Sequence, residues 1–135
     1  MQILSHAEKL IINSNGYVNN ELIHDLYTDW TELVFEFQDA EQIRDISNRL
    51  LELGKSRNSH LLIGTALDGL SLACFIENQF ESGLDYANRA ISYLKLTSNT
   101  FEIVNSYTNH GIYQYMLGLL DDANKSFEHT LSFGK

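Results

Sequence analysis

The chain has 135 residues, of which 44% are hydrophobic and 20% charged, so it is long enough and apolar enough to fold around a core as a single domain. Eighteen acidic residues against nine lysines and arginines give a net charge of −9, which disfavours nucleic acid and anionic membrane surfaces as partners. A single cysteine excludes an internal disulfide framework and is typical of the cytoplasm, and the absence of proline favours long helices with short polar turns.

The first segment, MQILSHAEKLIINSNG, carries its charges inside an apolar helical pattern and not ahead of it. This arrangement predicts a helix and not a signal peptide. No apolar run approaches the roughly 20 residues that a membrane span needs. We therefore expect a cytoplasmic protein with no membrane partner.

Three further segments with helical apolar periodicity follow, at 21–37, 60–76 and about 100–117. Each of them ends at a turn, and the turn residues recur along the chain: Gln38, Asn78 and Gly118. Three residues after each turn stands an acid: Glu41, Glu81 and Asp121. Acids stabilise a first helical turn, where backbone N–H groups are unpaired and the helix dipole is positive, so a second helix is predicted to begin after each turn. Asn99, followed three residues later by Glu102, predicts a capping box at the start of the third segment.

The second helices align residue by residue at an offset of 40, since Asp45 matches Asp85 (85 − 45 = 40) and Arg49 matches Arg89. This period predicts three helix-hairpin units at 20–55, 60–96 and 100–135 within one domain, 1–135. The same shift places 3–12 on 43–52, so 1–15 is expected to be the second helix of a preceding unit. A leading helix without its partner leads us to expect a fragment of a longer array.

Small residues recur where paired helices would meet: Ser71, Gly83, Ala90, Gly111 and Ala123. They allow close approach of two helices. With helix pairs at this spacing the chain resembles the tetratricopeptide repeats, most closely in its last two units. The resemblance implies an all-α helix-hairpin solenoid, a right-handed superhelix of about three units plus a leading orphan helix. The period of 40, against about 34 in the standard repeat, is similar to that of helical-repeat regions in large bacterial signalling and transcription-regulatory proteins.

Catalytic and metal-binding patterns are missing from the sequence. No two of the five histidines stand three or four residues apart, which disfavours a metal site on a helix. His110 is interpreted as an imidazole hydrogen-bonded between helices, and Cys74 as a buried, inert thiol. The acids at 25, 29, 32 and 36 form a helical stripe that is interpreted as solvated surface. We therefore expect no enzyme, no cofactor and no metal.

The resemblance implies that the first helix of each unit lines a concave groove for a protein or peptide. The expected groove residues are Asp25, Asp29, Glu32, Phe35, Asp68, Leu72, Phe75, Asn105, Asn109, Ile112 and Tyr115. Every lysine and arginine falls in a second helix or a linker, so the groove has no Lys or Arg of its own and suits a basic or amphipathic helical ligand. A purely solubilising role for the groove acids is the alternative.

These observations predict a protein-binding or peptide-binding repeat module within a larger signalling or transcription-regulatory protein. The alternative is a structural or self-association segment that homodimerises through its end helices. Exposed apolar positions such as Leu10 at one end and Leu131 at the other would then form the contact.

Overall fold

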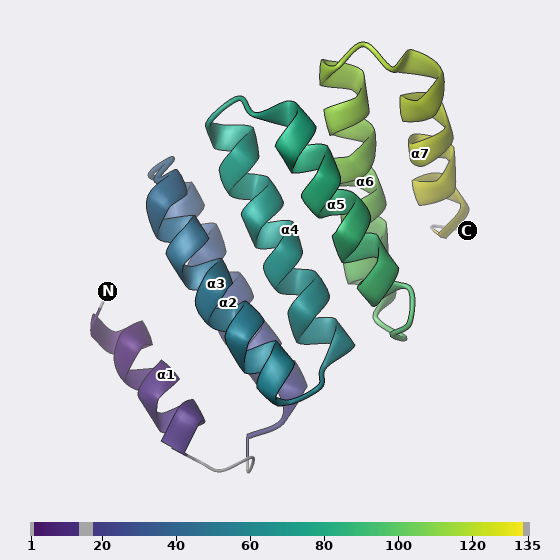
Figure 1. Cartoon of the computed structure of the whole chain (residues 1–135). Helices are drawn as coiled ribbons and strands as arrows, with labels where there is room; N and C mark the ends of the chain where they lie inside the picture. Colours follow the sequence, from purple (N-terminus) through teal and green to yellow (C-terminus); the bar gives the residue numbers. More distant parts are fainter. Residues whose placement is uncertain (1, 14–17, 134–135) are drawn as a thin grey trace.

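The computed structural model describes residues 2–13 and 18–133, which form seven α-helices packed as consecutive hairpins (Figure 1). The helices are α1 (Gln2–Asn13), α2 (Asn20–Phe35), α3 (Ala40–Ser56), α4 (His60–Ile76), α5 (Phe80–Leu94), α6 (Thr100–Met116) and α7 (Leu120–Phe133). The hairpins α2–α3, α4–α5 and α6–α7 follow one another in a row, with α1 at one end and α7 at the other. The expected all-α, helix-hairpin architecture is confirmed. Residues 1, 14–15 and 134–135 of the predicted segments lie outside the described residues.

The helices begin at the predicted period. The first helices of the hairpins start at Asn20, His60 and Thr100, and the second helices start at 40, 80 and 120, so each set advances by 40 residues (60 − 20 = 100 − 60 = 40). Side-chain oxygens of Asn19, Asp39, Ser59 and Asn99 cap four of these starts by accepting a backbone N–H at 2.8–3.1 Å.

The turns inside the hairpins share one backbone conformation. Gln38, Asn78 and Gly118 all have positive φ, at 54°, 59° and 80°. This left-handed conformation stops a helix and is easiest for glycine and asparagine, which occupy two of the three sites. The turn positions predicted from the repeat are therefore confirmed.

The core lies between neighbouring helices. Tyr27 and Trp30 of α2 pack with Ile43, Ile46 and Leu50 of α3 in one buried cluster, and Tyr27 and Trp30 have ring centroids 5.8 Å apart. A second cluster of leucines and Ala90 joins α4 to α5. Aromatic residues at helical spacing thus supply packing between helices, which is the expected use of such residues in a repeat fold.

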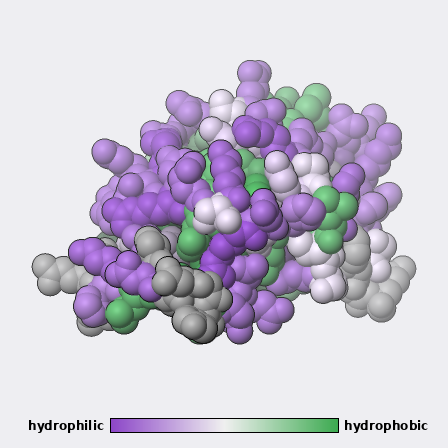
Figure 2. Space-filling view, turned by 60° about the horizontal axis from the view of Figure 1, so that its bottom comes forward, coloured by the Kyte–Doolittle hydropathy of each residue, from purple (hydrophilic) through white to green (hydrophobic). Residues whose placement is uncertain are grey.

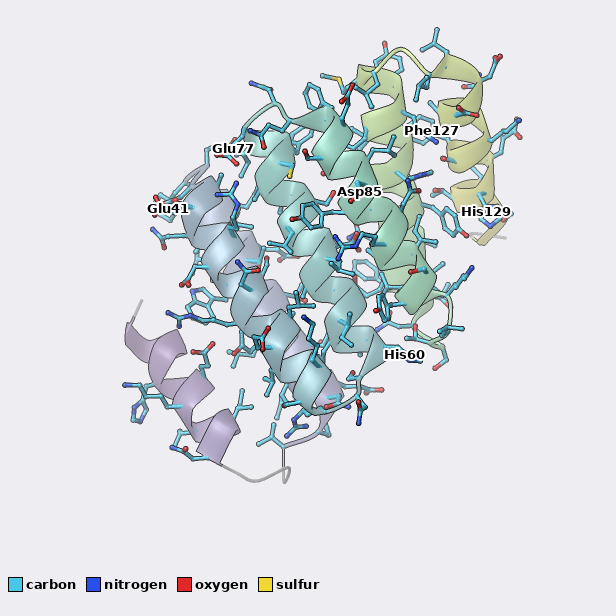
Figure 3. The ribbon with its side chains drawn as sticks, in the orientation of Figure 1. Glu41, His60, Glu77, Asp85, Phe127 and His129 are labelled. Carbon is cyan, nitrogen blue, oxygen red and sulfur yellow. The ribbon has the colours of Figure 1, made fainter. Side chains whose placement is uncertain are left out.

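Small residues set the distance between helices, as predicted. A Cβ on Gly111 of α6 would lie 2.6 Å from Cε1 of Phe127, and one on Gly83 of α5 would lie 2.7 Å from Cε1 of Tyr113. Figure 3 shows Phe127 on α7, and its ring covers Gly111 of α6. Ser71 is fully buried and donates a 3.0 Å hydrogen bond to the carbonyl of Gly83. These positions have no room for a larger side chain.

The row of hairpins is curved, with the first helices inside. α4 contacts both α2 and α6, whereas the backbones of α3, α5 and α7 make no contact with one another among the described residues. Helices on the inner side of a superhelix lie closer together than those on the outer side, so the surface formed by α2, α4 and α6 is the concave face.

One face of the molecule is mainly polar. Figure 2 shows a face on which hydrophilic residues predominate and hydrophobic residues show only in scattered patches. Among the described residues, no helix combines the length and the apolar character that crossing a membrane requires.

Candidate functional site

A cavity of about 420 Å³ lies in the concave face, with walls from α2, α3, α4 and α6. Its size falls within the range of about 300–1,000 Å³ that is usual for ligand sites. Tyr27, Phe35, Ile46, Leu50 and Leu72 supply apolar wall, and acids, amides and threonines supply the rest. Residues of three hairpins, and not of one, therefore form the walls of the cavity.

Six of the eleven predicted groove residues line this cavity: Glu32, Phe35, Asp68, Leu72, Asn105 and Asn109. They come from all three first helices, as the repeat pattern predicted. Whether they contact a partner stays a prediction.

The other five predicted residues lie elsewhere. Phe75 packs between helices, with its ring centroid 6.0 Å from that of Phe80 and 6.2 Å from that of Tyr113. Asp25, Asp29 and Tyr115 are exposed outside the cavity, and Ile112 is half-buried outside it. The prediction counted whole helix faces, whereas the cavity reaches only part of the faces of α2, α4 and α6 and is also lined by α3.

Asp68 is a buried acid of the cavity, with 7% of its surface exposed. The hydroxyl oxygen of Ser106 lies 2.9 Å from each of its carboxyl oxygens. Because a serine hydroxyl has one proton, it can donate to only one of the two oxygens at a time. Burial, and next the negative charge of Glu102, raise the pKa of Asp68 well above its usual range, although the bond from Ser106 acts in the opposite direction.

A buried histidine–carboxylate pair includes Glu102, which lines the cavity. Nε2 of His24 in α2 lies 2.8 Å from Oε1 of Glu102 in α6, and Nδ1 of His24 lies 3.1 Å from Oδ1 of Asp25. Burial alone would lower the pKa of His24, but the hydrogen bonds and charges of Glu102 and Asp25 outweigh it and raise that pKa above 6.5. The two acids therefore favour the protonated form of His24, which lies beside the cavity-lining Glu102.

The role of Glu102 differs from the sequence prediction. Asn99 caps α6 as expected, since its Oδ1 accepts the backbone N–H of Glu102 at 3.1 Å. The carboxylate of Glu102 does not return to Asn99 to complete a capping box, because it is bound by His24. No spacing rule in the sequence could find a pair separated by 78 residues.

The cavity is acidic and its walls contain no lysine or arginine. Glu32, Glu36, Asp68 and Glu102 all line it. Two arginines of α3 are paired elsewhere: Arg49 binds Glu8 at 3.0 Å, and Arg44 binds Glu77 at the end of α4. Figure 3 shows Glu77 beside the first turn of α3, where Glu41 lies, and neither residue lines the cavity. Asp68 therefore has no lysine or arginine as counterion.

Thr65 adds an unused polar atom to the cavity wall. Its hydroxyl oxygen is buried and has no hydrogen-bond partner in the structure. Thr65 stands one helical turn before Asp68, and both residues line the cavity. A buried polar group without a partner costs free energy, so a ligand group that bonded to the Thr65 hydroxyl would remove that cost.

The remaining candidates for chemistry have structural roles. Nδ1 of His110 lies 3.0 Å from Oγ of Ser126, which donates to Oε1 of Gln114 at 2.6 Å, so the predicted hydrogen-bonded imidazole is confirmed. Cys74 is buried, as predicted, and burial raises the pKa of its thiol, which keeps it protonated. Within residues 2–13 and 18–133, no three His, Cys, Asp or Glu side chains gather as they would around a metal ion.

Comparison with known proteins supports the fold. No family model matches the sequence, and no curated protein matches it. The structure is similar to the crystal structure of the TPR domain of Arabidopsis FLU, with a TM-score of 0.70 and 17% sequence identity over 84% of this chain and 96% of that one. The chain therefore has a TPR-like fold. At this level of identity the likeness concerns the fold alone.

Proposed function

We propose that this chain is a protein-binding module that holds a peptide segment of its partner against the concave face. The observation that carries the proposal is the cavity itself, which three first helices build together and whose walls hold four carboxylates and no lysine or arginine. Solenoids of helix pairs bind partners on such extended concave surfaces.

The charge of the concave face supports a basic or amphipathic helical ligand. Complementary charge speeds encounter and selects the partner more than it adds affinity. A cation-free groove repels the carboxylate end of a peptide, so a C-terminal tail is disfavoured as ligand. The period of 40 residues supports a place for the module within a larger signalling or transcription-regulatory protein, the setting that the sequence resemblance implies.

The proposal is tested by selecting peptides from a displayed random library on the immobilised chain. We expect enrichment of sequences with lysine or arginine and with apolar residues at helical spacing. Glu32→Lys, which reverses a charge at the cavity wall, is expected to weaken the selected peptides by at least about tenfold. The matched control is Asp85→Lys on α5, which Figure 3 shows outside the concave face.

Two results would overturn the proposal. One is a selection that enriches no sequence class over an unrelated helical protein. The other is equal weakening by Glu32→Lys and Asp85→Lys, which would place the peptides on the general acidic surface.

Exposed leucines at the ends of the row favour a second candidate function, association between copies of the chain. Leu120 and Leu131 of α7 are 55% and 67% exposed, and Leu10 of α1 is also exposed. The two leucines of α7 stand eleven residues apart, about three helical turns, and so share one face of the helix. A second copy of the chain would cover this face.

A further inference from the structure

The cavity joins an apolar wall to a buried polar end. Phe35, Leu50 and Leu72 line it together with the acid Asp68 and the unpartnered hydroxyl of Thr65. Lysine and arginine side chains have the same design, since each carries a charged head on an aliphatic stem that packs on apolar surface. A neutral apolar side chain would pack against the apolar wall but would leave Asp68 and the Thr65 hydroxyl without a hydrogen-bond partner from the ligand.

We propose that the cavity is a binding site for one cationic side chain, lysine or arginine, of a peptide ligand, with the charged head between Asp68 and the Thr65 hydroxyl. The inference rests on the proposed function, because it names the ligand group that the concave face recognises. It assigns a specific role to two side chains of α4 that a general acidic surface would not require.

The charges around the cavity favour a cation over other ligands. Four carboxylates in the walls repel an anion, and an amide or hydroxyl would leave Asp68 without a counterion. Ser106 can satisfy only one carboxyl oxygen of Asp68 at a time. His24 is already engaged by Glu102 and Asp25, so it does not serve as the counterion of Asp68.

The state of Asp68 in the free chain agrees with a missing cation. Burial raises its pKa, and the charge of Glu102 adds to this effect. A lysine ammonium or arginine guanidinium at hydrogen-bond distance would favour the ionised carboxylate and reverse the shift. Ion pairs that are partly buried and hydrogen-bonded are stronger than exposed ones. Such a pair would allow Asp68 to select the partner.

The test uses small probes that need no peptide partner. Nα-acetyl-lysine methylamide and Nα-acetyl-arginine methylamide are titrated into the isotope-labelled chain, and backbone amide shifts are followed by NMR. We expect saturable shifts at Thr65, Asp68 and their neighbours in α4. Nα-acetyl-norleucine methylamide, which has a neutral aliphatic side chain, is expected to bind at least about tenfold more weakly.

Two variants separate the site from the rest of the acidic surface. Asp68→Asn keeps the shape of the side chain and its capacity to accept from Ser106, and is expected to weaken the lysine probe by about tenfold or more. Asp29→Asn removes an exposed acid outside the cavity and is expected to leave binding unchanged. If Asp68→Asn does not fold, Thr65→Val serves instead, with an expected loss of about threefold to tenfold.

Three outcomes would overturn the cation site: equal binding of the norleucine probe, no saturable shift with either cationic probe, or equal effects of the Asp68 and Asp29 variants. Failure of the proposed function looks different. In that case the cationic probes bind in the cavity and Asp68→Asn weakens them, but the peptide library yields no selected sequence. Conversely, selected peptides that bind without contacting Asp68 would support the proposed peptide-binding function and contradict the proposed cation site.

Discussion

His24 of α2 and Glu102 of α6 form a 2.8 Å contact between side chains that are 78 residues apart and both more than nine-tenths buried. The backbones of α2 and α6 make no contact in the described part of the chain. This pair therefore joins the first and third hairpins directly, across α4. It links two of the helices that line the cavity.

Loss of this pair should destabilise the fold. His24→Ala leaves the buried carboxylate of Glu102 without its partner, and we expect the free energy of unfolding to fall by about 2–4 kcal/mol. Urea unfolding followed by circular dichroism measures the change. Asp25→Ala removes only an exposed partner of the same imidazole and should cost about 0.5 kcal/mol or less. Similar losses in the two variants would show that the bridge to α6 contributes little.

From pH 6.5 upward, stability should decrease as the pH rises. The pKa of His24 is raised above 6.5 on folding, so its contribution is complete below that value and is lost as the pH rises through the folded pKa. Asp68 acts in the same direction, because its raised pKa makes the folded chain bind more protons than the unfolded chain at pH values above 3.8. Urea unfolding at a series of pH values measures the slope, and Asp68→Asn should flatten it. Stability that increases from pH 6.5 upward would contradict the prediction.

The positions of the helices could be predicted because local chemistry determines them. Caps such as Ser59 and turn residues such as Asn78 act within three or four residues, and their period is visible in the sequence. The sequence also predicted that every lysine and arginine falls in a second helix or a linker, and among the described residues none lies in α2, α4 or α6. The acidic character of the concave face could therefore be predicted from the sequence.

The bridge between His24 and Glu102 could not be predicted, since it depends on how strongly the row of hairpins curves. That curvature follows from the sizes of side chains between helices, for example the ring of Tyr113 against Gly83. Such packing is a property of the assembled fold and not of any one segment. For the same reason the sequence could not show that the ring of Phe75, a residue of the expected groove, packs against Phe80 and Tyr113.

Enlarging a small residue between helices should be costly. Gly111→Ala places a methyl group against the ring of Phe127, and we expect a loss of about 1–3 kcal/mol in the free energy of unfolding. Phe127→Leu removes part of the ring, so the double variant Gly111→Ala with Phe127→Leu should lose less than the sum of the two single changes. Chemical denaturation of the four proteins closes this cycle. Strict additivity would show that the ring does not limit the space at Gly111.

Glu8 should control the attachment of α1. Its buried carboxylate accepts from the hydroxyl of Tyr27 in α2 and from Nη1 of Arg49 in α3. Glu8→Gln weakens both bonds, and we expect hydrogen exchange of α1 amides to accelerate by about tenfold, with little change in α4 and α5. Lys9→Gln, at the exposed neighbouring position, is the control. Faster exchange throughout the chain would mean that Glu8 supports the whole fold.

The exposed leucines of α7 should determine the oligomeric state. If a second copy covers the face that carries Leu120 and Leu131, the mass measured by light scattering after size separation rises with concentration towards that of a dimer. Leu131→Gln should return the mass to that of a monomer, because a polar side chain at the centre of an apolar contact removes the main gain from association. Leu10→Gln tests the other end of the row in the same way. Since these leucines lie outside the cavity, neither change should alter binding of the lysine probe. A constant monomer mass at every concentration would contradict self-association and would leave the concave face as the proposed functional surface.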